Sequence, residues 1–269
     1  MTEKRIVLCA DDYGYSPGVS RGIRELLERE RLSATSCMVV FPEFETDGPL
    51  LNPFLGRADI GLHFTLTVGR TIGSVAWEAH VHPRRLQQVV SELEQQVTKF
   101  VDVIGRPPDY IDGHQHVHVL PVVRDAVVRV ARRIGAYVRS TSDPIGIAMC
   151  RRPGLFESIY LARASRKLAA LARTAGVATN LGFRGVRTFR EKGPFRLLFQ
   201  RMIKDAGTGC LVMCHPGYPD ALLTERDPVQ TMREEELRYL AGPDFLRDLA
   251  SEGVVLSRLA NALSANGSA

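Results

Sequence analysis

The sequence predicts an α/β protein, built as a TIM-like (β/α) barrel in a single domain. Short apolar, β-branched runs alternate with helix-like patterns along the chain, which is typical of parallel strands joined by right-handed crossovers. Acidic residues and histidines follow several of these runs, at the strand ends where barrel sites gather. A closed or nearly closed barrel is the first expectation, and an open doubly wound sheet is the second.

The elements follow from local pattern. Ser16 and Pro17 form a helix-start signal that opens a helix over 18–31. In 84–104 apolar residues recur at spacings of three and four, and Gly105 then ends that helix. The other predicted helices are 122–134, 156–173 and 244–252. The predicted strands are 5–10, 34–41, 59–66, 108–112, 136–140, 177–181, 209–214 and 253–257.

Length and composition are those of one globular unit. The 269 residues are 45% hydrophobic, which suffices for a single large core. We expect one barrel domain over 1–262 and a flexible tail over 263–269. Neither a signal peptide nor a transmembrane run is recognised, so the expected location is the cytoplasm. The five cysteines are odd in number and lack zinc-ribbon spacing, which favours reduced thiols.

Positive charge is concentrated in one part of the chain. Residues 139–204 hold 14 Lys and Arg against 3 Asp and Glu. This excess could meet an anionic surface or substrate, or it could be a set of solvated helix faces. Neither an RNA-binding aromatic motif nor a phosphate-binding glycine loop stands in context, so we expect no nucleic-acid partner.

A pair of carboxylates closes the first predicted strand. Asp11 and Asp12 follow the apolar run 6–10. Neighbouring side chains of a strand point to opposite faces, but both can reach one pocket where the backbone turns. Two acids would then divide the work, one holding a metal ion and the other taking a proton from water. The alternative is an acidic pair at a helix N-terminus, which the delay of the cap to Ser16 disfavours.

Histidines mark two further strand ends. His63 lies at the end of the third predicted strand, and it is either a metal ligand or a hydrogen-bonded core residue. His114, His116 and His118 alternate after the fourth strand, and histidine is the commonest side-chain ligand for transition metals. At most one or two of the three can bind one ion. The remainder, together with Asp112, would orient the ligands or contact substrate.

His215 follows a buried strand, and Pro216 and Gly217 fix a sharp turn directly after it. A histidine so placed is a candidate general acid, and a structural histidine is the alternative. Cys210 and Cys214 lie nearby, but no second Cys/His pair completes a zinc site. We expect both cysteines to be small buried apolar residues.

Taken in order, these blocks resemble the YdjC/ChbG family of carbohydrate deacetylases. The matching blocks are Ala10–Gly14 with Ser16–Gly18, Gly61–His63, Asp112–His118 and Cys214–Gly217. The resemblance covers nearly the whole chain. It implies an irregular (β/α) barrel that removes N-acetyl groups from amino sugars, such as chitooligosaccharides, with one divalent metal ion.

The resemblance also assigns roles to individual residues. It implies Asp12, His63 and His114 as metal ligands and Asp11 as the base. By analogy with the NodB-type polysaccharide deacetylases, it implies His215 as the acid. Ligand chemistry of this kind suits Zn²⁺ or another transition ion, whereas the family also suggests Mg²⁺.

A narrower likeness is to the hopanoid-biosynthesis (HpnK-like) branch, through Thr179–Phe183, Cys214–Gly217 and Arg226–Pro228. It implies a lipid-linked N-acetylglucosamine substrate. The basic stretch 139–204, with a basic amphipathic helix over 156–173, would then contact an anionic membrane at its inner surface. The sequence leaves the oligomeric state open, with a homodimer as one outcome.

Two other function classes stay open at this point. A metal-dependent phosphoesterase or amidohydrolase also places an HxH motif on a barrel, but usually after the first strand, where this chain has Asp11 and Asp12. A non-catalytic barrel that binds glycans or membranes would have no need of Asp11.

Overall fold

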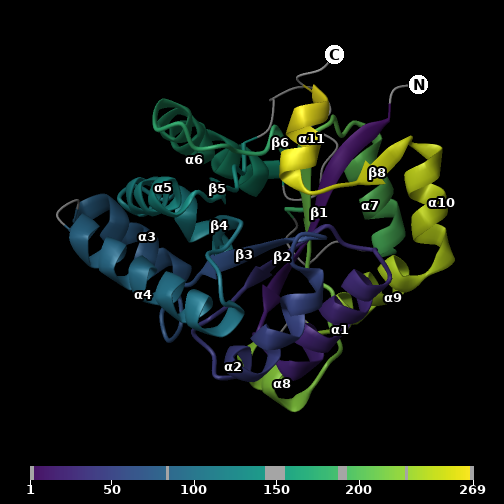
Figure 1. The fold of residues 1–269 in the computed structure, drawn as a ribbon, viewed down its shortest axis with the longest axis horizontal. Coiled ribbons are helices and arrows are strands. Elements are labelled where there is room, and N and C mark those ends of the chain that lie inside the picture. The colour runs from purple at the N-terminus through teal and green to yellow at the C-terminus, as the bar shows by residue number, and fades with distance from the viewer. Residues whose placement is uncertain (1–2, 83–84, 143–154, 187–192, 228–229, 267–269) are drawn as a thin grey trace.

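The chain folds around a curled parallel sheet whose outer side is covered by helices (Figure 1). The computed structural model describes residues 3–82, 85–142, 155–186, 193–227 and 230–266. The strands are β1 (Lys4–Tyr13), β2 (Ala34–Cys37), β3 (Asp59–Phe64), β4 (Tyr110–Gly113), β5 (Tyr137–Val138), β6 (Gly182–Arg184), β7 (Cys210–Cys214) and β8 (Val254–Leu256). The α-helices are α1 (Pro17–Glu28), α2 (Glu43–Asp47), α3 (Ile72–Val81), α4 (Leu86–Ile104), α5 (Val123–Ile134), α6 (Leu155–Thr174), α7 (Phe195–Lys204), α8 (Ala221–Arg226), α9 (Thr231–Ala241), α10 (Pro243–Ser251) and α11 (Leu259–Asn266), with 3₁₀ helices η1 (Gly48–Phe54) and η3 (His114–Val119).

Strand order explains why the barrel stays open. The strands run β5-β4-β3-β2-β1-β7-β6, all pairs parallel, and β8 pairs only with the first residues of β1. β8 lies on the same side of β1 as β2, because the Ile6 carbonyl accepts from the Ser257 N–H and the Leu8 carbonyl accepts from the Ser33 N–H. Among the described residues, β5 and β6 are the two end strands of the sheet, and they do not pair with each other. The expectation of a TIM-like α/β fold is therefore confirmed, but as an open half-barrel.

The strand predicted over 177–181 is wrong in position. The strand in this part of the chain is β6, at Gly182–Arg184, and before it Thr179 forms an isolated bridge to Val138. The side chain of Asn180 takes over the backbone groups that a strand would have paired. Its Oδ1 accepts from the Ser140 N–H at 2.7 Å, and its Nδ2 donates to the Ser140 carbonyl at 2.9 Å.

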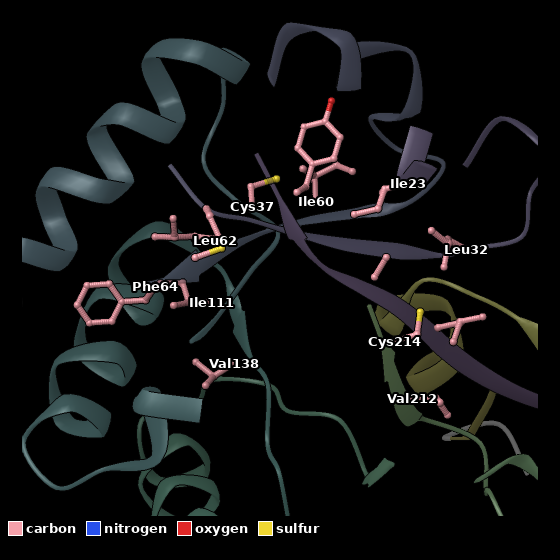
Figure 2. Close-up of a cluster of buried hydrophobic side chains, with 14 of the residues drawn as sticks. Ile23, Leu32, Cys37, Ile60, Leu62, Phe64, Ile111, Val138, Val212 and Cys214 are labelled. Atoms are coloured by element: carbon pink, nitrogen blue, oxygen red, sulfur yellow. The ribbon is translucent and has the colours of Figure 1, made fainter. Parts of the chain in front are cut away.

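The two faces of the sheet bury different side chains, because strand residues alternate in direction. On β1, Ile6 and Leu8 belong to the large cluster between sheet and helices, which Figure 2 shows in part. Val7 and Cys9 belong to a smaller cluster with Tyr110. These inner residues fill the curl of the half-barrel, and Asp11 continues their alternation at the carboxyl end of β1.

Helix ends follow the predicted signals. Ser16 caps α1, its Oγ accepting from the Val19 N–H, and Pro17 occupies the first turn. Gly105 ends α4 in the left-handed conformation, with φ of 85°. Figure 1 shows α4, α5 and α6 packed around one half of the curled sheet and α7, α9 and α10 around the other half.

The helix predicted over 156–173 is confirmed as α6, but part of its apolar side is used inside the protein. Leu168 is buried, and Leu171 packs against the main core, so neither is available to a membrane. Residues 143–154 and 187–192 of the basic stretch lie outside the described residues. Within the described chain, none of the helices combines the length and hydropathy that crossing a bilayer would need.

The C-terminal end of the domain and the state of the cysteines were also predicted from the sequence. α11 continues to Asn266, four residues beyond the domain end expected at 262. The four described cysteines, Cys9, Cys37, Cys210 and Cys214, are buried. Cys210 and Cys214 lie in the main core, as small apolar residues do, and Cys150 lies outside the described residues.

Close packing inside the curl gives a first prediction. A Cβ added to Gly61 would overlap the ring of Tyr110, which is itself fully buried. We expect Gly61→Ala to lower the free energy of unfolding by about 1–3 kcal/mol, the usual range for overpacking a tight core. Urea denaturation measures this loss. The matched control is Gly207→Ala, because no atom of the described residues lies within 4 Å of its added Cβ. Equal stability of the two variants would contradict the prediction.

Candidate metal centre

The two carboxylates at the end of β1 reach one pocket because the backbone turns between them. Asp12 adopts a left-handed conformation with φ of 72°, which is uncommon for a residue other than glycine. The pairing of β1 with β2 shifts register between Ala10 and Tyr13, as in a β-bulge. The turn that the sequence required for a shared pocket is therefore present, and it places conformational strain at a candidate functional residue.

Asp12 lies between two histidines from other elements. Its Oδ1 lies 3.4 Å from His63 Nε2 and 3.3 Å from His114 Nδ1. Ligands about 2.1 Å from a common tetrahedral ion stand roughly 3.4 Å apart. Although buried, this oxygen has no hydrogen bond of good geometry to any described residue. A buried polar atom without a partner is costly, and a bound cation would satisfy it. The residues therefore fit a metal ion.

His63 is oriented by groups behind it. Its Nδ1 lies 2.6 Å from Asp112 Oδ1, and Ser36 Oγ donates to the same oxygen at 2.5 Å. A carboxylate on one ring nitrogen fixes the tautomer and turns the other nitrogen toward a metal, which is the usual arrangement around metal-binding histidines. Asp112 thus lies behind a candidate ligand, which is one of the two positions that the sequence left open for it, and Ser36 was not foreseen.

Asp11 is paired on both oxygens by a fully buried arginine. Arg139 Nη1 donates to Asp11 Oδ2 at 2.7 Å and Nη2 to Asp11 Oδ1 at 2.6 Å. The same Nη2 lies 2.6 Å from Asp112 Oδ2. Sequence reasoning missed Arg139, although it directly follows β5 at the same edge of the sheet. Its place at a predicted strand end was the signal that could have found it.

The charges in the site decide which groups are ionised. Burial raises the pKa of Asp11, but Arg139 outweighs this and lowers it well below the usual range. Burial raises the pKa of Asp12 in the same way, and Arg233 lowers it further than burial raises it. Burial lowers the pKa of His63, but Asp112 and Asp11 raise it to about 10. The negative potential that holds a proton on His63 also attracts a cation.

Two sets of donor atoms are close enough to hold an ion, and they share His63. One set is Asp12, His63 and His114; the other is Asp11, His63 and Asp112. In the second set the carboxylates already bind the Arg139 guanidinium, and Asp112 occupies His63 Nδ1. A second cation there would meet the positive charge of Arg139. The first set is therefore the better metal site.

The alternating histidines separate in space because their backbone is irregular. Gln115 and His116 of η3 have φ of 51° and 58°. His114 turns toward Asp12, whereas His116 meets the ring of Phe183, with centroids 5.6 Å apart. Burial, followed by Arg139, lowers the pKa of His116 to about 3, so its imidazole is neutral. It is half-buried, at the edge of the site.

His118 lies behind the site. It is fully buried, and its Nε2 lies 3.1 Å from the backbone carbonyl of Arg139. Burial lowers its pKa well below the usual value, and His116 and Arg139 add to that shift. His118 is thus a neutral donor that supports the Arg139 backbone. Of the two roles that the sequence left open for it, support fits this position and substrate contact does not.

His215 follows β7 at the same edge. Its backbone N–H donates to Glu236 Oε2 of α9 at 2.5 Å. Burial lowers the pKa of His215, and the nearby carboxylates of Asp12 and Asp11 oppose this. The structure thus gathers every strand-end residue that the sequence singled out, from Asp11 to His215. It adds two buried arginines, Arg139 and Arg233.

The fold and this donor set define the class of protein: an open α/β half-barrel with a candidate His-His-Asp metal centre at the carboxyl edge of its strands. A profile of the YdjC-like protein family matches residues 5–251. The chain belongs to the YdjC-like family.

Individual relatives agree with this placement. The chain is 28% identical to the chitooligosaccharide deacetylase of Serratia marcescens, over 94% of this chain and 97% of that protein. It is 29% identical to a carbohydrate deacetylase of Geobacillus stearothermophilus, over 93% and 94%. In fold it resembles a candidate cellobiose-phosphate cleavage protein of Enterococcus faecalis, with a TM-score of 0.71, 20% identity, and coverage of 97% and 99%.

Proposed function

We propose that the protein is a metal-dependent hydrolase that removes the N-acetyl group from an N-acetylated amino sugar. The observation that carries the proposal is the convergence of Asp12, His63 and His114, with a buried Asp12 oxygen left for an ion. The deacetylase names of the full-length relatives support the reaction class. When His63 is neutral, three carboxylates face two guanidinium groups, so the buried site is short of positive charge, which favours cation binding.

The donor set favours a transition ion. Two imidazole nitrogens and one carboxylate suit Zn²⁺, whereas Mg²⁺ prefers a shell of oxygen ligands. A divalent ion held by Asp12, His63 and His114 would lower the pKa of a bound water and polarise the acetyl carbonyl. Behind it, Asp112 and Ser36 keep His63 in the tautomer that binds through Nε2.

Asp11 is the proposed base. Because Arg139 keeps its pKa low, the carboxylate is ionised throughout the neutral range and can accept a proton from water. Arg139 fixes both oxygens in place. Oδ1 also accepts from Cys9 Sγ at 3.4 Å, so Oδ2 is the oxygen with a lone pair left for the water among the described contacts. The same ion pair makes Asp11 a weak base, so the reaction depends on a water that is already acidified.

His215 is the proposed acid. Amide hydrolysis must place a proton on the leaving sugar amine, because an amide anion is a poor leaving group. Burial lowers the pKa of His215, so its protonated form is a stronger acid than a solvent-exposed imidazolium. His215 would give its proton to the amine nitrogen as the carbon–nitrogen bond breaks.

Acetate release with and without metal tests the proposal. The protein is stripped with a chelator and assayed on N-acetylglucosamine oligomers and on a lipid-linked N-acetylglucosamine, with Zn²⁺ or Mg²⁺ added singly. We expect chelation to lower turnover at least 100-fold and Zn²⁺ to restore it, because the ion supplies the acidic water. The two substrates separate a soluble acceptor from the hopanoid-type lipid acceptor that the sequence suggested.

The alternatives give different results in the same experiment. Phosphate release from p-nitrophenyl phosphate without acetate release would favour the phosphoesterase. Glycan binding that survives chelation, without acetate release on either substrate, would favour the non-catalytic barrel and overturn the deacetylase.

A further inference from the structure

Helix α9 buries two ionisable side chains on one face. Arg233 is 4% exposed and Glu236 is 1% exposed. They are three residues apart, so they lie side by side on the helix. Burying a charge is costly unless it is paired, so each of these side chains requires a specific partner in the core. Arg233 has its partner in Asp12, and Glu236 has its partner in the backbone of His215.

Arg233 holds the outer oxygen of the candidate ligand. Its Nη2 donates to Asp12 Oδ2 at 2.6 Å and to Asp227 Oδ2 at 2.7 Å. Asp227 therefore anchors the guanidinium, and the guanidinium in turn anchors Asp12. With Oδ2 engaged, Asp12 presents only Oδ1 toward His63 and His114.

This hold matters because Asp12 has a strained backbone. Its φ of 72° places the side chain in the pocket, but a residue in that conformation tends to relax unless other contacts fix it. A free carboxylate could also rotate or bind an ion through both oxygens. Pairing with Arg233 removes these alternatives before any ion arrives.

The same helix also fixes the turn that carries His215. Glu236 Oε2 accepts from the His215 N–H, and the backbone carbonyl of Arg233 accepts from the Gly217 N–H at 3.2 Å. α9 thus connects the end of β1 to the turn after β7. It lies close to α1, where a Cβ on Gly22 would stand 3.3 Å from the Leu237 side chain.

We propose that Arg233 is a positioning residue that sets the metal affinity by holding Asp12 as a one-oxygen ligand, with Glu236 holding the His215 turn in register from the same helix. The proposal rests on the proposed function, because it takes Asp12 to be a metal ligand. Arg233 acts through Asp12 and contacts no reacting atom.

The test is calorimetric titration of Zn²⁺ into the metal-free, full-length protein. We expect Arg233→Met to weaken zinc binding about 10–100-fold, the usual effect of losing a partner behind a metal ligand. Arg233→Lys keeps the charge but loses the second nitrogen that holds the guanidinium, Nε, which donates to Asp227 Oδ2 at 3.2 Å, so it should recover part of that loss. The matched control on the same helix is Arg238→Met, because Arg238 is 71% exposed and pairs only with Glu234 among the contacts described. It should bind zinc as wild type does.

Wild-type zinc affinity in folded Arg233→Met would overturn the proposal. If that variant does not fold, Arg233→Lys decides: an affinity equal to wild type would overturn the proposal, and a loss of about tenfold would support it. The proposed function can fail separately. A wild-type protein that binds Zn²⁺ but releases no acetate would overturn the deacetylase. The ratio of the zinc affinities of wild type and the Arg233 variants would still test the role of Arg233. A wild-type protein that binds no Zn²⁺ would overturn both.

Discussion

Asp11→Asn is expected to bind zinc within about threefold of wild type and to lose roughly 100- to 10,000-fold in kcat, the range for a missing general base. The amide is nearly isosteric with the carboxylate but cannot accept a proton at neutral pH. Zinc affinity should survive because Asp11 is outside the favoured donor set, which Asp12, His63 and His114 form. Steady-state acetate release and calorimetric zinc titration measure the two effects.

Stability must be followed in the same variant. Arg139 donates to both oxygens of Asp11. The amide oxygen of asparagine can accept one of these bonds, but the amide nitrogen cannot accept the other, so we expect a lower melting temperature. Glu30→Gln is the matched carboxylate-to-amide control, because Glu30 is 80% exposed and its described ion pair is with Arg57, which is not a residue of the site. A folded Asp11→Asn protein that turns over near the wild-type rate would remove Asp11 from the role of base.

Arg139→Met is expected to lower the free energy of unfolding by about 3–5 kcal/mol, because it leaves two buried carboxylates without their cation. Asp11 and Asp112 are 2% and 0% exposed and both pair with Arg139 at 2.6 Å. For a chain of this size, the loss corresponds to a melting temperature lower by roughly 10 °C. Thermal and urea denaturation of the metal-free protein measure it.

An exposed arginine gives the comparison for this experiment. Arg247 is 73% exposed and pairs with Asp244, so Arg247→Met should change stability by less than about 0.5 kcal/mol. Arg139→Lys should fall between the two, since it keeps the charge but not the two-point contact. If Arg139→Met melts like Arg247→Met, the buried carboxylates do not depend on Arg139 for their charge.

The sequence was most informative for metal-binding residue types that lie at the ends of predicted strands. His63 and Asp12 could be expected at one site because parallel strands end at a common edge, whatever the exact curvature of the sheet. The same rule applies to Arg139, but an arginine at the start of a basic stretch gives no local sign that it is buried. Its full burial becomes visible only when β5 is placed beside β4.

Other features have no local signal. The strand predicted over 177–181 has suitable residues, but the Asn180 side chain pairs with the Ser140 backbone in place of a neighbouring strand. Arg233 lies in an ordinary charged helix sequence, more than 200 residues from Asp12. Only the packing of α9 beside the end of β1 brings the two together.

By itself, the sequence determined the alternation of strands and helices, the apolar layers, and the set of acids and histidines at the strand ends. These depend on periodicity and chain order, which are local properties. The tertiary structure decided that the half-barrel stays open, that His114 faces Asp12 while His118 lies behind the site, and that Arg139 and Arg233 neutralise the carboxylates. These depend on which distant residues share a low-dielectric interior, where buried charges require partners, and the chain order does not specify those partners.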